Sequence, residues 1–131
     1  MARLYLVRHG KAASGWGEAP DPCLNGLGRL QAEAMAKVLG PLGPMPIVTS
    51  PMARTRETAA ALAGTWGVTP GIDHRISEIP SPHGKDTDRI QWLKRLMTDQ
   101  WTHLEEPLKV WRGELIRALC AFDKDTVVIS H

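Results

Sequence analysis

Two short apolar runs, one near each end of the chain, carry the strongest signal in the pattern of hydrophobic and polar positions. The first, residues 4–7, leads directly into Arg8 and His9, and the last, residues 126–130, leads into His131. Short runs rich in valine, isoleucine and tyrosine are typical of strands. Because ligands of open α/β sheets bind at the carboxyl ends of the strands, the pattern predicts two histidines at a functional sheet edge.

Helical and strand-like patterns alternate between these two runs. We expect a helix over residues 27–39 with Asn25 as its N-cap, and a stripe of apolar residues on its buried face. The members of that stripe are Leu27, Leu30, Ala34, Met35 and Val38.

A second strand is expected at residues 46–49. Ser50 is expected to cap the next helix, with Pro51 at its first position and its end near residue 63. Further along, the pattern predicts a short strand at residues 68–72 and helices over about 86–97 and 107–119. This alternation predicts an α/β fold with a largely parallel sheet covered by helices, in a single domain of residues 1–131.

Composition narrows the functional classes. The chain has 131 residues, of which 43% are hydrophobic and 23% charged, and a net charge of +2, which gives no basic surface for nucleic acid. No apolar segment approaches the roughly 20 residues that span a bilayer. Cys23 and Cys120 have no metal-binding or redox spacing, and the apolar run at the N-terminus is too short for a secretory signal. We therefore expect a cytoplasmic protein without nucleic acid or membrane partners.

The chemistry-bearing residues fit a phosphoryl group. Guanidinium groups of Arg8 and Arg54 suit its oxygens, and the helix that contains Arg54 adds backbone donors at its N-terminus. A neutral imidazole, from His9, is a competent nucleophile, and Glu78 can act as general acid and base. These steps require no cofactor and no metal, and the sequence has no evident carboxylate pair for magnesium.

Five segments, in this order along the chain, resemble the histidine phosphatase superfamily, also called the phosphoglycerate mutase-like family. They are residues 8–10, 24–32, 50–59, 76–78 and 128–131. The resemblance implies a three-layer α/β/α sandwich with a mostly parallel sheet.

The resemblance also implies catalytic roles. His9 carries the phosphoryl group covalently, Arg8, Arg54 and His131 hold its oxygens, and Glu78 serves as acid and base. Lys11, Ser14, His83 and Lys85 are candidates for a rim around the substrate. Solvated charge is the simpler interpretation of Lys11, His83 and Lys85 taken singly, and Ser14 is at best an auxiliary contact.

Two departures from the family pattern matter. Ala12 and Gly15 stand where many members have Thr and Asn, which favours the smaller phosphatases over sugar-phosphate mutases. Relatives continue beyond the second histidine, whereas this sequence ends at His131, so we expect a domain truncated at its C-terminus.

The resulting hypothesis is a metal-independent phosphatase that hydrolyses phosphate monoesters of a small metabolite or phosphoprotein through a phosphohistidine on His9. Three alternatives stay open: a phosphoglycerate-type phosphomutase, a protein phosphohistidine phosphatase, and a non-catalytic phosphate-binding module. The sequence leaves the natural substrate undetermined, and an oligomer is compatible with it.

Overall fold

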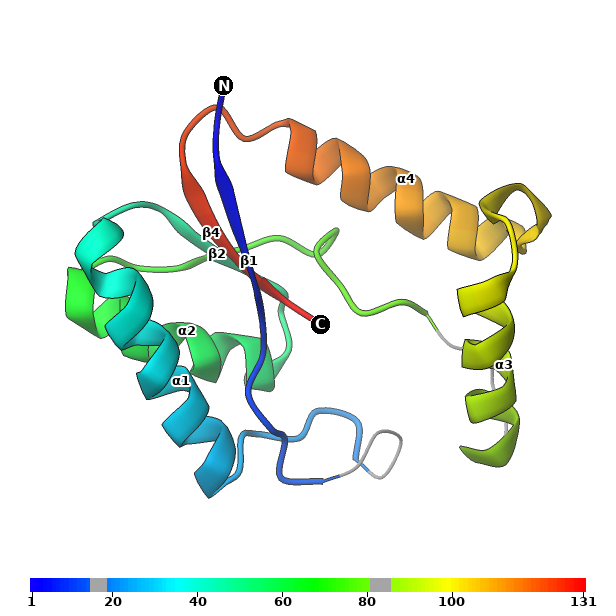
Figure 1. The fold of residues 1–131 in the computed structure, drawn as a ribbon, viewed down its shortest axis with the longest axis horizontal. Helices are drawn as coiled ribbons and strands as arrows, with labels where there is room; N and C mark the ends of the chain where they lie inside the picture. Colours follow the sequence, from blue (N-terminus) through cyan, green and yellow to red (C-terminus); the bar gives the residue numbers. More distant parts are fainter. Residues whose placement is uncertain (15–18, 81–85) are drawn as a thin grey trace.

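A computed structural model describes residues 1–14, 19–80 and 86–131. Its centre is a four-stranded, wholly parallel sheet with the strand order β1-β4-β2-β3 (Figure 1). The strands are β1 (Leu4–Arg8), β2 (Ile47–Thr49), β3 (Gly71–Ile72) and β4 (Thr126–Ser130). The parallel α/β architecture expected from the sequence is confirmed.

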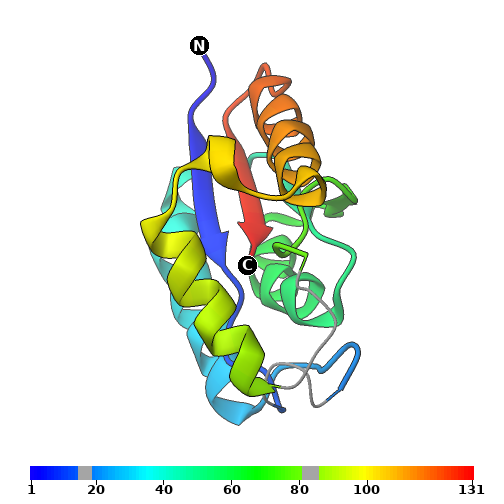
Figure 2. The same cartoon turned by 90° about the vertical axis from the view of Figure 1, so that its right-hand side faces the viewer.

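Helices lie on both faces of this sheet (Figure 2). One face carries α1 and α2, and the other carries α4. Figure 1 shows α3 apart from the sheet, next to the N-terminal end of α4. The helices are α1 (Gly26–Leu39), α2 (Ala53–Trp66), α3 (Asp86–Thr98) and α4 (Glu106–Cys120), with single 3-10 turns at Gly40–Leu42 and Trp101–His103. No helix in the described ranges has the length and apolar character to cross a membrane.

The core is centred on β4, the strand between β1 and β2. Val127 and Ile129 face α1 and α2. Val128 faces the opposite layer, where it packs with Ala118 of α4 and with Ile76 from the loop after β3. All three β4 side chains are almost fully buried, and burial of each contributes about 1.5–3 kcal/mol. The strand that His131 follows is therefore paired with a strand on each edge and buried on both faces.

The expected apolar stripe of α1 is wrong. Leu27, Leu30 and Val38 are 50%, 62% and 72% exposed, and only Met35 of that stripe packs against the core. The residues that α1 buries are small: Gly28, Ala32 and Ala36. Small side chains let this helix approach its neighbours closely, so side-chain size rather than hydrophobicity selects its inner face. The N-cap is confirmed, since Asn25 Oδ1 accepts the Gly28 N–H at 2.8 Å.

The expected boundaries of the second helix are also wrong. It begins at Ala53 after Met52, without a side-chain cap from its N-cap residue, and it continues to Trp66. Gly67 ends it in the left-handed conformation, with φ of 65°. Ser50 does not cap this helix and is hydrogen-bonded instead to groups behind the candidate site.

Candidate active site

Four side chains that were expected to share a site come together at the carboxyl edge of the sheet. His9 follows β1, His131 follows β4, Arg54 lies in the first turn of α2, and Glu78 lies in the loop after Ile76. The two imidazole centroids are 5.3 Å apart, and Arg54 Nη2 lies 2.8 Å from Glu78 Oε2 and 3.3 Å from His131 Nδ1.

Strand register explains why the two histidines meet. Arg8 of β1 pairs with Ser130 of β4, so the residue that follows each strand is brought beside the other. The His9 N–H donates to the Ser130 carbonyl at 3.0 Å, which extends the ladder into the site.

The tautomer of His9 is set by its own backbone. His9 Nδ1 lies 2.6 Å from the Gly10 carbonyl oxygen, which can only accept, so Nδ1 carries the proton. Burial lowers the pKa of His9, and the nearby Arg54 and Arg8 charges lower it further. The ring is therefore neutral near pH 7, with the Nε2 lone pair available as a nucleophile.

The Gly10 peptide is held between two helices. Its N–H donates to Thr58 Oγ1 at 3.0 Å, and Thr58 in turn donates to the Arg54 carbonyl at 2.7 Å. On the other side, a Cβ on Gly10 would lie 2.4 Å from the Gly28 carbonyl oxygen of α1. Only glycine fits this close approach, and it fixes the carbonyl that orients His9.

Further polar contacts hold the segment after Gly10. The Lys11 N–H donates to Gln31 Oε1 of α1 at 2.9 Å, and the Leu24 N–H donates to Glu57 Oε2 of α2 at 2.9 Å. Sequence reasoning missed these supporting residues and Thr58. Their only signal is their place within the two helical segments that carry the family resemblance.

Arg54 is the buried cation of the cluster. It is 7% exposed, and its carboxylate partner, Glu78, has a side chain that is 32% exposed. A buried guanidinium needs an anionic partner, and its forked donors match the oxygens of a phosphoryl group. Arg56, two residues further along α2, is exposed as expected.

His131 is the more deeply enclosed histidine. Its side chain is 5% exposed, and burial, together with the Arg54 and His9 charges, lowers its pKa to about 4. Its Nδ1 faces Arg54, whereas its Nε2 lies 2.9 Å from Ser50 Oγ on the buried side of the ring. The lowered pKa values leave both imidazoles neutral near pH 7.

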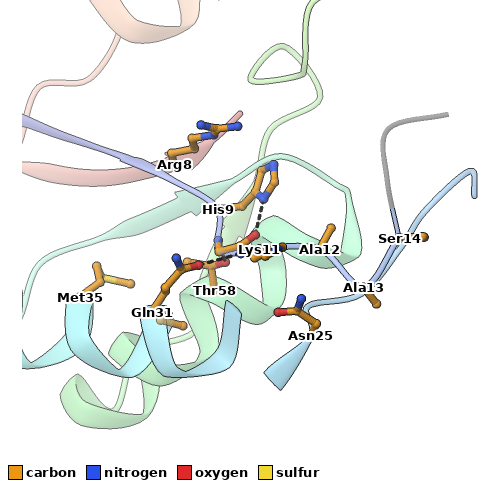
Figure 3. A pocket seen from close by; sticks show the side chains of 12 residues that line it. Arg8, His9, Lys11, Ala12, Ala13, Ser14, Asn25, Gln31, Met35 and Thr58 are labelled. Carbon is orange, nitrogen blue, oxygen red and sulfur yellow. Dashed lines mark hydrogen bonds between the residues drawn. The ribbon is translucent and has the colours of Figure 1, made fainter. Parts of the chain in front are cut away.

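A cavity of about 720 Å³ adjoins the cluster at His9 (Figure 3). Arg8, Lys11 and Ser14 line this cavity together with His9, so two of the four expected rim residues border it. The other two, His83 and Lys85, lie outside the described residues. Gln31 and Met35 of α1 also border the cavity, as Figure 3 shows.

Comparison with known proteins identifies the family. A profile of the histidine phosphatase superfamily (branch 1) matches residues 4–121. The chain belongs to the histidine phosphatase superfamily. The resemblance seen in the sequence is thereby confirmed over most of its length.

Within the histidine phosphatase superfamily, the chain is similar to two curated glucosyl-3-phosphoglycerate phosphatases. It is 38% identical over 80 residues to the one from Mycobacterium tuberculosis, across 58% of this chain and 36% of the relative. It is 39% identical over 82 residues to the one from Mycolicibacterium vanbaalenii, across 60% of this chain and 36% of the relative. The matched region thus spans about a third of the length of these histidine phosphatases.

Solved histidine phosphatase structures share the fold. A structure named mycobacterial hydrolase 1 superposes with a TM-score of 0.74 at 25% identity, covering 100% of this chain and 73% of that chain. The mycobacterial glucosyl-3-phosphoglycerate phosphatase in complex with inorganic phosphate gives a TM-score of 0.74 at 24% identity and the same coverage.

Proposed function

We propose that this histidine phosphatase family member is a metal-independent phosphatase that hydrolyses phosphate monoesters through a phosphohistidine on His9. One observation carries the proposal: His9, whose Nδ1 bonds to the Gly10 carbonyl and whose Nε2 is left available, stands beside the buried Arg54 and 5.3 Å from the second imidazole, His131. A nucleophile next to preorganised donors is what phosphoryl transfer requires.

In the first step, His9 Nε2 attacks phosphorus and the bond to the ester oxygen breaks. Once phosphoryl oxygens take the place of Glu78 on Arg54, the Glu78 carboxyl is free to carry a proton, and it gives this proton to the leaving alcohol while Arg8, Arg54 and His131 hold the phosphoryl oxygens. In the second step, the Glu78 carboxylate takes a proton from water as the water oxygen attacks phosphorus. The N–P bond breaks, inorganic phosphate leaves and His9 is restored.

The proposed substrate is a small phosphorylated metabolite. The curated relatives are named for glucosyl-3-phosphoglycerate, which combines a phosphate ester, a carboxylic acid and a sugar in one molecule. The cavity beside His9 offers room for the non-phosphoryl part, and Lys11 on its rim supplies a cation for an additional acidic group. Ser14 adds a hydroxyl to the same rim.

Glu78 favours an ester over a phosphohistidine substrate, because an alkoxide leaving group needs an acid more than a nitrogen leaving group does. Its 2.8 Å contact with Arg54 keeps it within the cluster that would hold the phosphoryl group. The mutase and the non-catalytic module are outcomes that the assays below distinguish.

The decisive experiment compares the chain with its His9→Ala variant on p-nitrophenyl phosphate, with a rapid acid-free quench to trap phosphorylated protein. We expect turnover and the trapped phosphate to disappear together. Exposed His103, in the turn before α4, supplies the control variant His103→Ala, which should retain both. Ordinary turnover by His9→Ala would rule out the nucleophile assignment.

A panel of substrates completes the test. Release of inorganic phosphate from phosphorylated sugar acids supports the phosphatase. Isomerisation of 3-phosphoglycerate that depends on a bisphosphate primer would identify a mutase, preferred action on a phosphohistidine peptide would identify a protein phosphatase, and phosphate binding without turnover would identify a binding module.

A further inference from the structure

Two buried hydroxyl groups lie behind His131, on the side of the ring that faces away from Arg54. Ser50 Oγ is 2.9 Å from His131 Nε2, and Thr55 Oγ1 is 2.7 Å from Ser50 Oγ. Both residues are 0% exposed. Because buried polar atoms need partners, each proton in this group must have an acceptor.

The direction of the hydrogen bonds follows from the donors available. The Arg54 guanidinium can only donate, so the 3.3 Å contact from its Nη2 makes His131 Nδ1 an acceptor. The proton of the neutral ring is then on Nε2, and it is donated to Ser50 Oγ.

The remaining hydroxyl protons continue in the same direction. Ser50 donates to Thr55 Oγ1, and Thr55 donates to the Met52 carbonyl oxygen, which lies 2.9 Å away. The chain of donors ends at a backbone acceptor, so no proton in it is left without a partner.

The opposite direction is unfavourable. If Ser50 donated to Nε2, the proton of the ring would lie on Nδ1. Two hydrogen-bond donors, Nδ1–H and the Arg54 guanidinium, would then face each other without an acceptor between them. Glu78 Oε2 lies 3.9 Å from Nδ1, which is too far to accept that proton. His9 faces His131 edge-on, with an interplanar angle of 68°.

We infer that Ser50, backed by Thr55, is a positioning residue that keeps the proton of neutral His131 on Nε2 and leaves Nδ1 open toward the phosphoryl site. This inference rests on the proposed function for the use of the site, but the proton position is a property of the free protein. With its proton held at Nε2, the His131 ring accepts a hydrogen bond from Arg54 at Nδ1. Once phosphoryl oxygens replace that contact, Nδ1 can bind a proton and donate it to them without rotation of the ring.

The first test reads the proton position directly. Nitrogen-15 spectra of the histidine rings at pH 7 should show His131 protonated at Nε2, with its signals assigned by their loss in His131→Asn. Thr55→Val has nearly the same shape as threonine but lacks the hydroxyl that accepts from Ser50. In this variant Ser50 is free to donate to Nε2, so the proton should shift toward Nδ1.

Thr55→Ser is the matched control, because it keeps a hydroxyl and should keep the proton on Nε2. Ser50→Ala, which leaves Nε2 without a partner, should shift the proton as Thr55→Val does. Circular dichroism and urea unfolding verify that each variant is folded. A wild-type His131 protonated at Nδ1, or identical ring signals in Thr55→Val and Thr55→Ser, would overturn the inference.

The second test connects the proton to function. For a hydrolysed ester, Thr55→Val should lower kcat/KM about tenfold, the size expected when a buried hydrogen bond is lost, and Thr55→Ser should stay within about twofold. Equal activities of the two folded variants would contradict the positioning role. A wild-type chain without turnover would count against the proposed function alone, because the ring spectra do not depend on turnover.

Discussion

The rings of His9 and His131 face each other edge-on with centroids 5.3 Å apart, although they come from opposite ends of the chain. Parallel pairing of β1 with β4 produces this arrangement, since Arg8 and Ser130 are partners in the ladder. Adjacent parallel strands that each end in a histidine thus bring the two rings to the same edge of the sheet.

Replacement of Arg54 should impair activity more than replacement of any exposed cation. Arg54→Ala removes the buried fork that would bind phosphoryl oxygens, and we expect kcat/KM to fall about 10²–10³-fold. Arg56→Ala, on the exposed side of the same helix, should leave it unchanged. Steady-state assays on one ester compare the two, and a similar loss in both would contradict a specific role for Arg54.

The effect of Glu78→Gln should depend on the leaving group. An alkyl phosphate needs a proton on its departing oxygen, so its kcat should fall about 10²–10⁴-fold. A p-nitrophenolate departs without protonation, and the same variant should hydrolyse that ester with a much smaller loss. Equal losses on the two esters would show that Glu78 is not the acid.

The depressed pKa of His131 predicts a loss of stability in acid. The pKa is 6.5 for an ordinary histidine and about 4 in the folded protein, so the unfolded chain binds the proton first as the pH falls. Stability from this group is present above pH 6.5, decreases between 6.5 and about 4, and amounts to roughly 3 kcal/mol in total. The lowered pKa of His9 acts in the same direction.

Urea unfolding at several pH values between 7 and 4 measures this effect. The His131→Asn variant, which has no imidazole at this position, should lose less free energy of unfolding over that range. An identical pH dependence of the two proteins would show that His131 titrates normally in the folded state.

Two glycines within helices should respond oppositely to replacement by alanine. A Cβ on Gly28 would lie 2.2 Å from the Lys11 carbonyl oxygen, so Gly28→Ala should destabilise the protein by about 1–3 kcal/mol. A Cβ on Gly64 in α2 has nothing within 4 Å, and Gly64→Ala should stabilise it by about 0.5–1 kcal/mol. Chemical denaturation of both variants checks the sign of each change.

Local patterns in the sequence were sufficient for the first, second and last strands and for the residues that follow them, whereas the strand expected at residues 68–72 is limited to Gly71–Ile72. Residues 4–7 and 126–130 are strands, and the side chains expected at their ends do lie together. The pattern failed for α1, because Leu27 and Leu30 were assigned to the core by hydrophobicity, whereas close packing selected Gly28 and Ala32. Steric fit between helices is a tertiary property that a single helix does not encode.

The hydrogen bonds behind the site could not be predicted for a related reason. Ser50 before a proline has the local pattern of a helix cap, yet its hydroxyl bonds to His131, at the far end of the chain. Thr58 likewise reaches the Gly10 peptide across the fold. Such contacts depend on how β2, α2 and β4 are placed in space. The catalytic roles, the His83 and Lys85 rim and the single-domain organisation stay predictions.

The contact between Gly10 and Gly28 has a mechanical consequence. It joins main chain to main chain, so no side-chain torsion can absorb a displacement between them. Gln31 and Met35 of α1 line the neighbouring cavity, so a ligand bound there would contact this helix. A shift of α1 along its axis would then displace the Gly10 peptide, whose carbonyl orients His9. Ligand binding in the cavity and the orientation of the His9 ring are thereby coupled.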